Sequence, residues 1–314
     1  MAALGGETIF QNGLQDTDNK GRWIRKSAGF RNIISKTDPH FQPEFGRYHL
    51  YVSYACPWAN RTIAVINVKG LRDCVTMSAV HPTWQRTRPD STDDLHIGWT
   101  FGGQVCTNVI GLGKFKGCGT EDEVNGAKFL RDIYEMAQDE TGKYSTPVLW
   151  DKKLLTIVNN ESSEIMRMLS SEFNDWATGP LATLDLYPVS FRTHVDAAND
   201  WIYRGINDCV YKCGFAKTQV AYDEAIDLLI GTLAKLEILL STRRYVVGPV
   251  FTEADIRLFM SLVRFDEVYV VYFKCNIVCI RELPNIVNYC RDVYQIPGMA
   301  ESIRMDDIKE HYFS

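Results

Sequence analysis

The stretch Tyr51-Val-Ser-Tyr-Ala-Cys-Pro-Trp-Ala-Asn-Arg-Thr62 marks the point at which a strand gives way to a helix. Apolar residues alternate with others from Tyr48 to Ser53, and this period of two is typical of a half-buried strand. Between Ile63 and Val68, apolar residues recur at spacings that suit a helix. Pro57 favours the first helical turn, where its missing N–H would be unpaired anyway. The sequence therefore predicts that Cys56 lies at the amino end of a helix.

This position bears on the chemistry of Cys56. The free N–H groups and the positive end of the helix dipole would lie beside the sulfur and favour thiolate over thiol. A small buried cysteine at a turn is the alternative interpretation. Ala59 stands where a dithiol oxidoreductase would carry its second cysteine, so no disulfide can form within the motif. A lone thiolate of this kind has to be resolved by an external thiol.

The composition is that of a globular chain of one large or two ordinary domains. It has 314 residues, of which 46% are hydrophobic and 23% are charged. The net charge of −5 predicts no nucleic-acid partner and no attraction to an anionic membrane. Apolar runs such as residues 268–273 are too short for a membrane span, and residues 1–20 lack the pattern of a secretory signal. These features predict a cytoplasmic protein.

The cysteines indicate neither a disulfide framework nor a metal site. Nine cysteines are an odd number spread over a long chain. Cys209 with Cys213, and Cys275 with Cys279, are spaced so that each pair could share a helix face. Zinc sites usually combine closer pairs with histidines, whereas the six histidines here are dispersed. We therefore expect no metal, and we expect the eight cysteines other than Cys56 to be inert thiols.

The chain divides into four predicted regions. Residues 1–45 are polar and are predicted to form a surface arm with a short apolar-basic piece. Residues 46–172 follow the order strand, helix, strand, helix, hairpin, helix, which indicates an α/β thioredoxin-like domain. Residues 173–188 contain turn signals and two prolines and are predicted to be a linker. Residues 189–314 are predicted to form an all-helical domain.

Local signals add detail to this division. Thr120 with Glu123 predicts a capping box for a helix that continues to Met136, and Thr252 with Asp255 predicts another. Apolar residues that recur at alternating spacings of four and three positions predict one buried stripe along a helix, made of Tyr222, Ile226, Leu229, Leu233, Leu236 and Leu240. Residues 81–119 are long and weakly periodic, and their two tryptophans predict a loop that is packed at least in part.

Several motifs together resemble one family. Residues 55–62, Ala-Cys-Pro-Trp-Ala-Asn-Arg-Thr, resemble the catalytic motif of the glutathionyl-hydroquinone reductases, the Omega-like Xi class of glutathione transferases. Residues 207–216, 252–257, 264–275 and 311–313 are similar to further stretches of this class. The resemblance implies a thioredoxin-like domain followed by an all-α domain, glutathione as co-substrate, and a homodimer built through the helical domains.

The resemblance also implies roles for individual residues. Cys56 matches the catalytic cysteine, and Tyr211 and Tyr312 match phenols that face the aromatic substrate. The matching glutathione-binding residues are Trp99, Lys143, Thr146, Pro147, Glu161 and Ser162. Pro147 is expected to be cis, although its position alone fits a trans proline at the first residue of a strand equally well. Glu161 and Ser162 would hold the ammonium and carboxylate of the γ-glutamyl end, although both also suit ordinary helix capping.

Two residues depart from the family pattern. Asn60 replaces a histidine, and Lys143 replaces an arginine whose bidentate fork a lysine cannot reproduce. The expected activity is the glutathione-dependent reduction of glutathionyl-hydroquinones through a Cys56–glutathione mixed disulfide. The alternatives are an Omega-like thiol transferase or dehydroascorbate reductase, and a non-catalytic module that keeps the fold to bind ligands.

Overall fold

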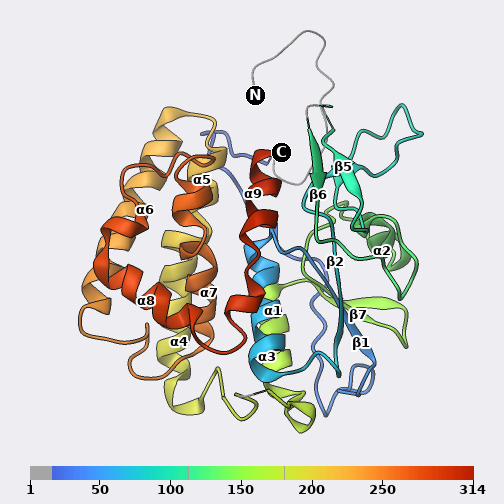
Figure 1. Cartoon of the computed structure of the whole chain (residues 1–314), viewed down its shortest axis with the longest axis horizontal. Coiled ribbons are helices and arrows are strands. Elements are labelled where there is room, and N and C mark those ends of the chain that lie inside the picture. Colours follow the sequence, from blue (N-terminus) through green and yellow to red (C-terminus); the bar gives the residue numbers. More distant parts are fainter. Residues whose placement is uncertain (1–15, 110, 112, 180) are drawn as a thin grey trace.

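The computed structural model describes residues 16–109, 111, 113–179 and 181–314. One half of the molecule contains a four-stranded sheet with its own helices, and the other half is a larger group of helices (Figure 1). Helices α1 (Pro57–Lys69) and α3 (Ser162–Ser171) lie between the sheet and the larger helical group. The first fifteen residues of the predicted arm lie outside the described residues.

The sheet has the order β2-β1-β7-β8. Strand β1 (Tyr48–Val52) pairs in parallel with β2 (Thr76–Ala79) and antiparallel with β7 (Val148–Asp151), which pairs antiparallel with β8 (Thr156–Asn159). The alternation in β1 predicts a half-buried strand, and this was wrong, because all five residues are buried. Successive side chains enter two different apolar cores on the two faces of the sheet.

The junction predicted between strand and helix is confirmed. Cys56 is the N-cap residue of α1, with extended backbone angles, and Pro57 occupies the first helical position. The helix ends at Gly70, which adopts a left-handed conformation with φ of 69°. The thiol therefore lies at the amino end of a buried helix, as the motif predicts.

The predicted start of the next helix was wrong. Helix α2 spans Leu130–Met136 and begins after Phe129, far beyond Thr120. The hydroxyl of Thr120 instead accepts a hydrogen bond from the N–H of Ala79, and its own N–H donates to the Ala79 carbonyl. Thr120 thus extends the edge of the sheet beside β2, and its side chain is not available to cap a helix.

The long segment 81–119 is packed, as its tryptophans indicate. It contains two small antiparallel pairs, β3 (Gln85–Arg86) with β4 (Ile97–Gly98) and β5 (Val105–Thr107) with β6 (Lys114–Lys116). The ring centroids of Trp84 and Trp99 are 5.4 Å apart in an edge-on arrangement.

The larger helical group is formed by the second part of the chain. It comprises α4 (Arg192–Ile202), α5 (Cys209–Phe215), α6 (Gln219–Leu240), α7 (Glu253–Leu262), α8 (Pro284–Tyr294) and α9 (Met305–Phe313). The predicted stripe of α6 is buried except for Tyr222, which is partly exposed. The capping box of Thr252 and Asp255 at the start of α7 is confirmed. None of the helices in the described part of the chain is both long and apolar enough to cross a membrane.

A fully buried arginine joins the two parts of the molecule. Arg264 follows α7, and its Nη1 donates to the carbonyl of Ala55 at 2.6 Å, while its Nε donates to that of Met260 at 2.8 Å. It also donates to the side-chain oxygen of Asn60. The amide nitrogen of Asn60 in turn donates to the carbonyl of Ser302 at 2.9 Å. Asn60, which replaces the family's histidine, is therefore a buried link between α1 and the helical group.

Candidate functional site

The thiol of Cys56 lies against a proline-containing turn. Cys56 is half-buried, and its Sγ donates to the carbonyl of Thr146 at 3.5 Å. The Thr146–Pro147 peptide bond is cis, which confirms the expectation drawn from the resemblance. Strand β7 begins at the next residue, so the sheet holds this turn beside the start of α1. The geometry places the thiol directly beside the backbone of this turn.

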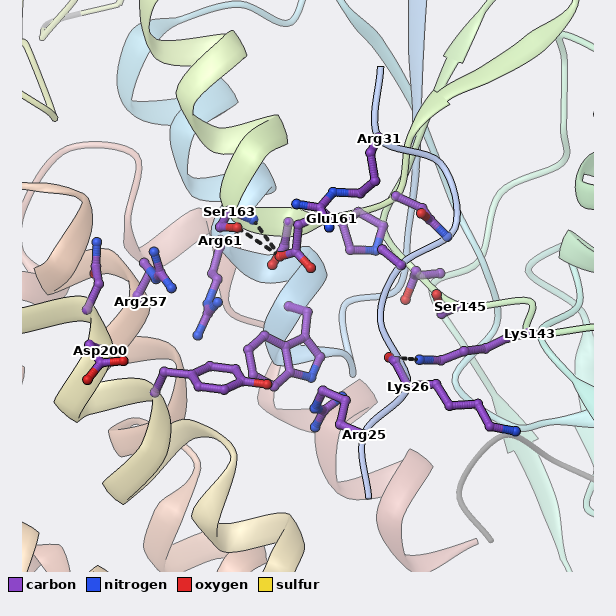
Figure 2. Close-up of a pocket in the computed structure, with 18 of the residues that line it drawn as sticks. Arg25, Lys26, Arg31, Arg61, Lys143, Ser145, Glu161, Ser163, Asp200 and Arg257 are labelled. Atoms are coloured by element: carbon purple, nitrogen blue, oxygen red, sulfur yellow. Dashed lines mark hydrogen bonds between the residues drawn. The ribbon is translucent and has the colours of Figure 1, made fainter. Parts of the chain in front are cut away.

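A cavity of about 470 Å³ opens beside this turn, between the sheet side and the helical group (Figure 2). It is lined by residues from the arm, the start of α1, the cis-proline turn, the start of α3, and α4 and α7. Those used below are Arg25, Lys26, Arg31, Trp58, Arg61, Lys143, Thr146, Pro147, Glu161, Ser162, Asp200 and Arg257. Trp58 and Thr146 both line this cavity, and both are neighbours of Cys56.

The start of α3 forms one wall of the cavity. Glu161 is the N-cap residue, and its Oε1 accepts hydrogen bonds from the N–H and the hydroxyl of Ser163 at 3.1 and 2.9 Å. Ser162 is buried at the first helical position. Ordinary capping is thus present, and it leaves a carboxylate, a hydroxyl and a helix N-terminus facing one cavity. Such a wall can bind a group that carries both an ammonium and a carboxylate.

Lys143 lies on the opposite side of the cavity, near Lys26 (Figure 2). Its Nζ donates to the main-chain carbonyl of Lys26 at 2.5 Å. Burial lowers the pKa of Lys143, and the neighbouring charge of Arg25 lowers it further. The amines of this end can neutralise a second anionic group of a ligand that spans the cavity.

Two phenols meet in the helical part of the molecule. The hydroxyls of Tyr211 on α5 and Tyr312 on α9 are 3.2 Å apart, although the residues are 101 positions apart in the chain. Both side chains are buried. Burial raises the pKa of Tyr211 and of Tyr312, and the nearby Cys56 adds to both shifts. Both phenols therefore keep their protons at neutral pH and can act as donors.

Trp99 lies in a separate aromatic cluster. Its ring stacks on the imidazole of His311 with centroids 4.7 Å apart, and Trp84 packs edge-on against both rings. Burial lowers the pKa of His311 to about 4, and its Nδ1 contacts the carbonyl of Pro82 at 2.7 Å. Trp99 is not among the residues that line the cavity. His311, on which Trp99 stacks, is the chain neighbour of Tyr312, and their two rings have centroids 5.2 Å apart.

The arm contributes to the site in a way that the sequence analysis missed. Trp23 is buried and stacks on the ring of Tyr211, with centroids 5.7 Å apart, so this part of the arm is not at the surface as predicted. The guanidinium of Arg25 lies 4.4 Å from the centroid of Trp58 and forms an ion pair with Asp208 at 2.7 Å. The apolar-basic composition of this piece was the signal that the arm returns to the body of the protein.

Sequence reasoning also missed two arginines, Arg61 and Arg257, which line the cavity. Arg61 belongs to the opening motif, and Arg257 ends the Thr-Glu-Ala-Asp-Ile-Arg stretch. Within the described residues, no three His, Cys, Asp or Glu side chains are grouped so that they could hold a metal ion. The nine cysteines are all free.

Comparison with protein families gives matches to both parts of the chain. Residues 55–172 match the family model of the glutathione S-transferase N-terminal domain, and residues 219–292 match that of the glutathione S-transferase C-terminal domain. Among curated proteins, the glutathionyl-hydroquinone reductase YqjG of Escherichia coli is 42% identical, over 93% of this chain and 84% of its own length. The glutathionyl-hydroquinone reductase PcpF of Sphingobium chlorophenolicum is 38% identical, over 97% of this chain and 89% of its own length.

Solved structures agree with these matches. The glutathione transferase Xi of Phanerochaete chrysosporium is 43% identical, covers 92% of each chain and superposes with a TM-score of 0.82. The glutathione-bound structure of YqjG from Escherichia coli is 41% identical, with a TM-score of 0.79, and covers 91% of this chain and 87% of that one.

Proposed function

The chain belongs to the glutathionyl-hydroquinone reductases, the Xi class of glutathione transferases, and from this premise we propose that it uses glutathione to reduce glutathionyl-hydroquinones to free hydroquinones. Cys56 is the proposed nucleophile. Thr146, Pro147, Glu161 and Ser162, with Lys143 and Trp99, are the proposed glutathione-binding residues.

In the first step, the thiolate of Cys56 attacks the sulfur of the thioether. A sulfur–sulfur bond forms to glutathione, and the carbon–sulfur bond breaks with its electron pair passing to the ring carbon. That carbon takes up a proton, and we assign its donation to Tyr211 or Tyr312. The hydroquinone leaves, and a mixed disulfide remains on Cys56.

In the second step, a second glutathione attacks the mixed disulfide. Its sulfur bonds to the first glutathione, and the Cys56 thiolate leaves. Glutathione disulfide carries away the two oxidising equivalents, so the enzyme returns to its starting state. Ala59 supports this assignment, because no second cysteine is present in the motif to resolve the disulfide internally.

The observation that carries the proposal is the meeting of Tyr211 and Tyr312. A thiol transferase that only exchanges disulfides needs no proton donor for carbon. Here two buried phenols, 3.2 Å apart, are near enough to Cys56 for its charge to affect both. This arrangement favours carbon–sulfur cleavage over the thiol transferase and the ligand-binding alternatives.

The test is a turnover assay with glutathionyl-menadione and glutathione. Free hydroquinone and glutathione disulfide are expected to form in equal amounts. Dehydroascorbate and hydroxyethyl disulfide are assayed in parallel with the same preparation. Turnover of these two compounds without release of hydroquinone would favour the Omega-like alternative, and turnover of none would favour a ligand-binding module.

Three wider proposals accompany this function. We retain the division into an arm, residues 1–45, two domains, 46–172 and 189–314, and a linker, 173–188.

We propose a homodimer through the helical domains, supported by exposed apolar side chains around the 264–275 motif such as Val271, Tyr272 and Ile277. Sedimentation as a monomer at micromolar concentration would contradict it. We also propose a cytoplasmic location, which the nine free cysteines support.

A further inference from the structure

Two arginines, Arg61 of α1 and Arg257 of α7, lie at the same end of the cavity as Asp200 (Figure 2). Arg61 is only 2% exposed, and its Nε has no hydrogen-bond partner among the described residues. Its Nη2 donates to the neutral side-chain oxygen of Asn207 at 2.9 Å. The Nε of Arg257 is likewise buried and unpaired within the described chain. Buried donors in this state call for an acceptor.

The carboxylates near this end are already engaged. Glu253 is 3.7 Å from Nη1 of Arg257, and its Oε1 also accepts a closer bond from Arg167 at 2.8 Å. Asp200 forms an ion pair with Arg204 at 2.9 Å. Glu253 is thus shared with Arg167, and Asp200 is paired with Arg204, so these two acids neutralise the cationic end of the cavity only in part.

Arg61 itself has no carboxylate partner in the part of the chain that the structure describes. Its guanidinium lies 4.3 Å from the ring centroid of Trp58, which is a further uncharged neighbour. Burial, and then the charge of Arg257, lower the pKa of Arg61 to about 9. Of these two buried like charges only Arg257 has a carboxylate within 4 Å, at 3.7 Å, so the pair is costly and a bound anion would reduce that cost.

We propose that Arg61 and Arg257 form a receptor for a carboxylate, and that they bind the α-carboxylate at the γ-glutamyl end of glutathione. This inference rests on the proposed function and extends it, since Ser162 and the start of α3 then supply only part of that site. Guanidinium groups suit the task because their planar N–H donors match the geometry of a carboxylate.

The position of Glu161 identifies which carboxylate is bound. Glu161 lines the same cavity as both arginines (Figure 2), and its charge raises the pKa of Arg61 and of Arg257 against the larger effect of burial. The γ-glutamyl end of glutathione carries a carboxylate and an ammonium on one carbon. It could therefore place the carboxylate beside the two arginines and the ammonium beside Glu161. The glycine carboxylate, at the other end, is then directed to Lys143, which Figure 2 shows across the cavity.

The experiment compares three S-methylated tripeptides, which cannot exchange with Cys56, by isothermal titration calorimetry. They are S-methylglutathione, the analogue that lacks the α-carboxylate of its γ-glutamyl group, and the analogue that lacks the α-amino group. Loss of the carboxylate should weaken binding to the wild-type protein about 10- to 100-fold, as expected for a charge-assisted hydrogen bond. Loss of the amino group reports separately on Glu161.

The same ligands are then titrated into Arg257→Gln, Arg257→Lys and Arg61→Lys proteins, with Arg31→Gln as the matched control. Arg31 lines the same cavity, but its guanidinium is held by Glu164. The affinities of Arg257→Gln for S-methylglutathione and for the analogue without the α-carboxylate should differ by less than about 3-fold. Arg257→Lys and Arg31→Gln should keep most of the difference in affinity that the wild-type protein shows. Melting temperatures without ligand check that each variant is folded.

The outcomes separate this inference from the function on which it rests. If the wild-type protein binds the peptides with and without the carboxylate equally well, the receptor does not exist, although glutathione still binds. A discrimination that persists unchanged in folded Arg257→Gln and Arg61→Lys would also overturn the assignment. If S-methylglutathione itself does not bind and hydroquinone is not released, the proposed function fails first and the receptor with it.

Discussion

Two groups of thiols in this molecule have opposite surroundings. Cys56 is half-buried at the amino end of α1, beside the cis-proline turn and the cavity. Cys209, Cys213 and Cys275 are buried together among the helices, and the Sγ of Cys209 donates to the carbonyl of Ala225 at 3.2 Å. Hydrogen bonding to Cys213 and burial raise the pKa of the Cys209 thiol. The reactivity of a thiol is therefore expected to depend on its surroundings, and proximity to other thiols is not expected to make it reactive.

The strongest test of this comparison replaces one thiol from each group. Cys56→Ser should lower the kcat/KM for glutathionyl-menadione by more than about 10⁴-fold, because a hydroxyl is a poor nucleophile toward sulfur in this step. Cys213→Ala should keep kcat/KM within about 3-fold, since its thiol lies outside the proposed site. Full activity in Cys56→Ser would contradict the mechanism, and a large loss in folded Cys213→Ala would contradict the comparison.

Thiol labelling tests the comparison without mutation. Burial raises the pKa of Cys290 to about 12, so this thiol stays protonated below that pH and only about 10⁻⁴ of it is thiolate at pH 8. Glutathione disulfide should add one glutathione to the native protein, and peptide mass analysis should place it on Cys56. Labelling of Cys290 should be about 10³-fold slower. Cys279 is also partly exposed, so Cys279→Ser is the control for a second reactive thiol.

Helix α5 contains residues of both kinds, because in the sequence Tyr211 of the proposed site lies between the buried Cys209 and Cys213. If the phenols donate a proton to the leaving carbon, Tyr211→Phe with Tyr312→Phe should slow hydroquinone release about 10²-fold. The reduction of hydroxyethyl disulfide, which requires no protonation of carbon, should change by less than about 3-fold. Equal losses in the two assays would show that the tyrosines serve packing alone.

The smallest expected effect concerns Lys143. Lys143→Arg restores the forked donor of the family and should lower the KM for glutathione by about 2- to 5-fold with little change in kcat. The matched variant Lys26→Arg should have no such effect, because Lys26 holds Lys143 through its main-chain carbonyl. A KM that is unchanged in Lys143→Arg would mean that this amine does not contact glutathione.

What could be predicted from the sequence depended on the range of the interactions. The start of α1 at Cys56, the buried stripe of α6 from Ile226 to Leu240 and the capping box of Thr252 follow local rules, and each is confirmed. Thr120 shows where such rules fail, since its hydroxyl fits a helix cap equally well but bonds to the edge of the sheet. A single sequence cannot choose between these two partners.

The site shows the same limit. The resemblance supplied Cys56 and the residues matched to glutathione, and the cis bond before Pro147 is confirmed. It did not supply Arg25, whose place between aromatic rings depends on the arm folding back across both parts of the chain. Nor did it indicate Arg257, which lies beside the cavity only because α7 packs on α1. Contacts of this kind arise from tertiary packing alone.

The buried link from Arg264 to Ala55 and Asn60 has a consequence for how proteins of this kind can be recombined. The carbonyl of Ala55, directly before the nucleophile, and the side chain of Asn60 both depend on an arginine from the other half of the chain. A hybrid that takes its first half from this protein and its second half from another chain keeps this link only if that second half supplies an arginine in the place of Arg264. Loss of this arginine is therefore expected to disturb the backbone directly before Cys56.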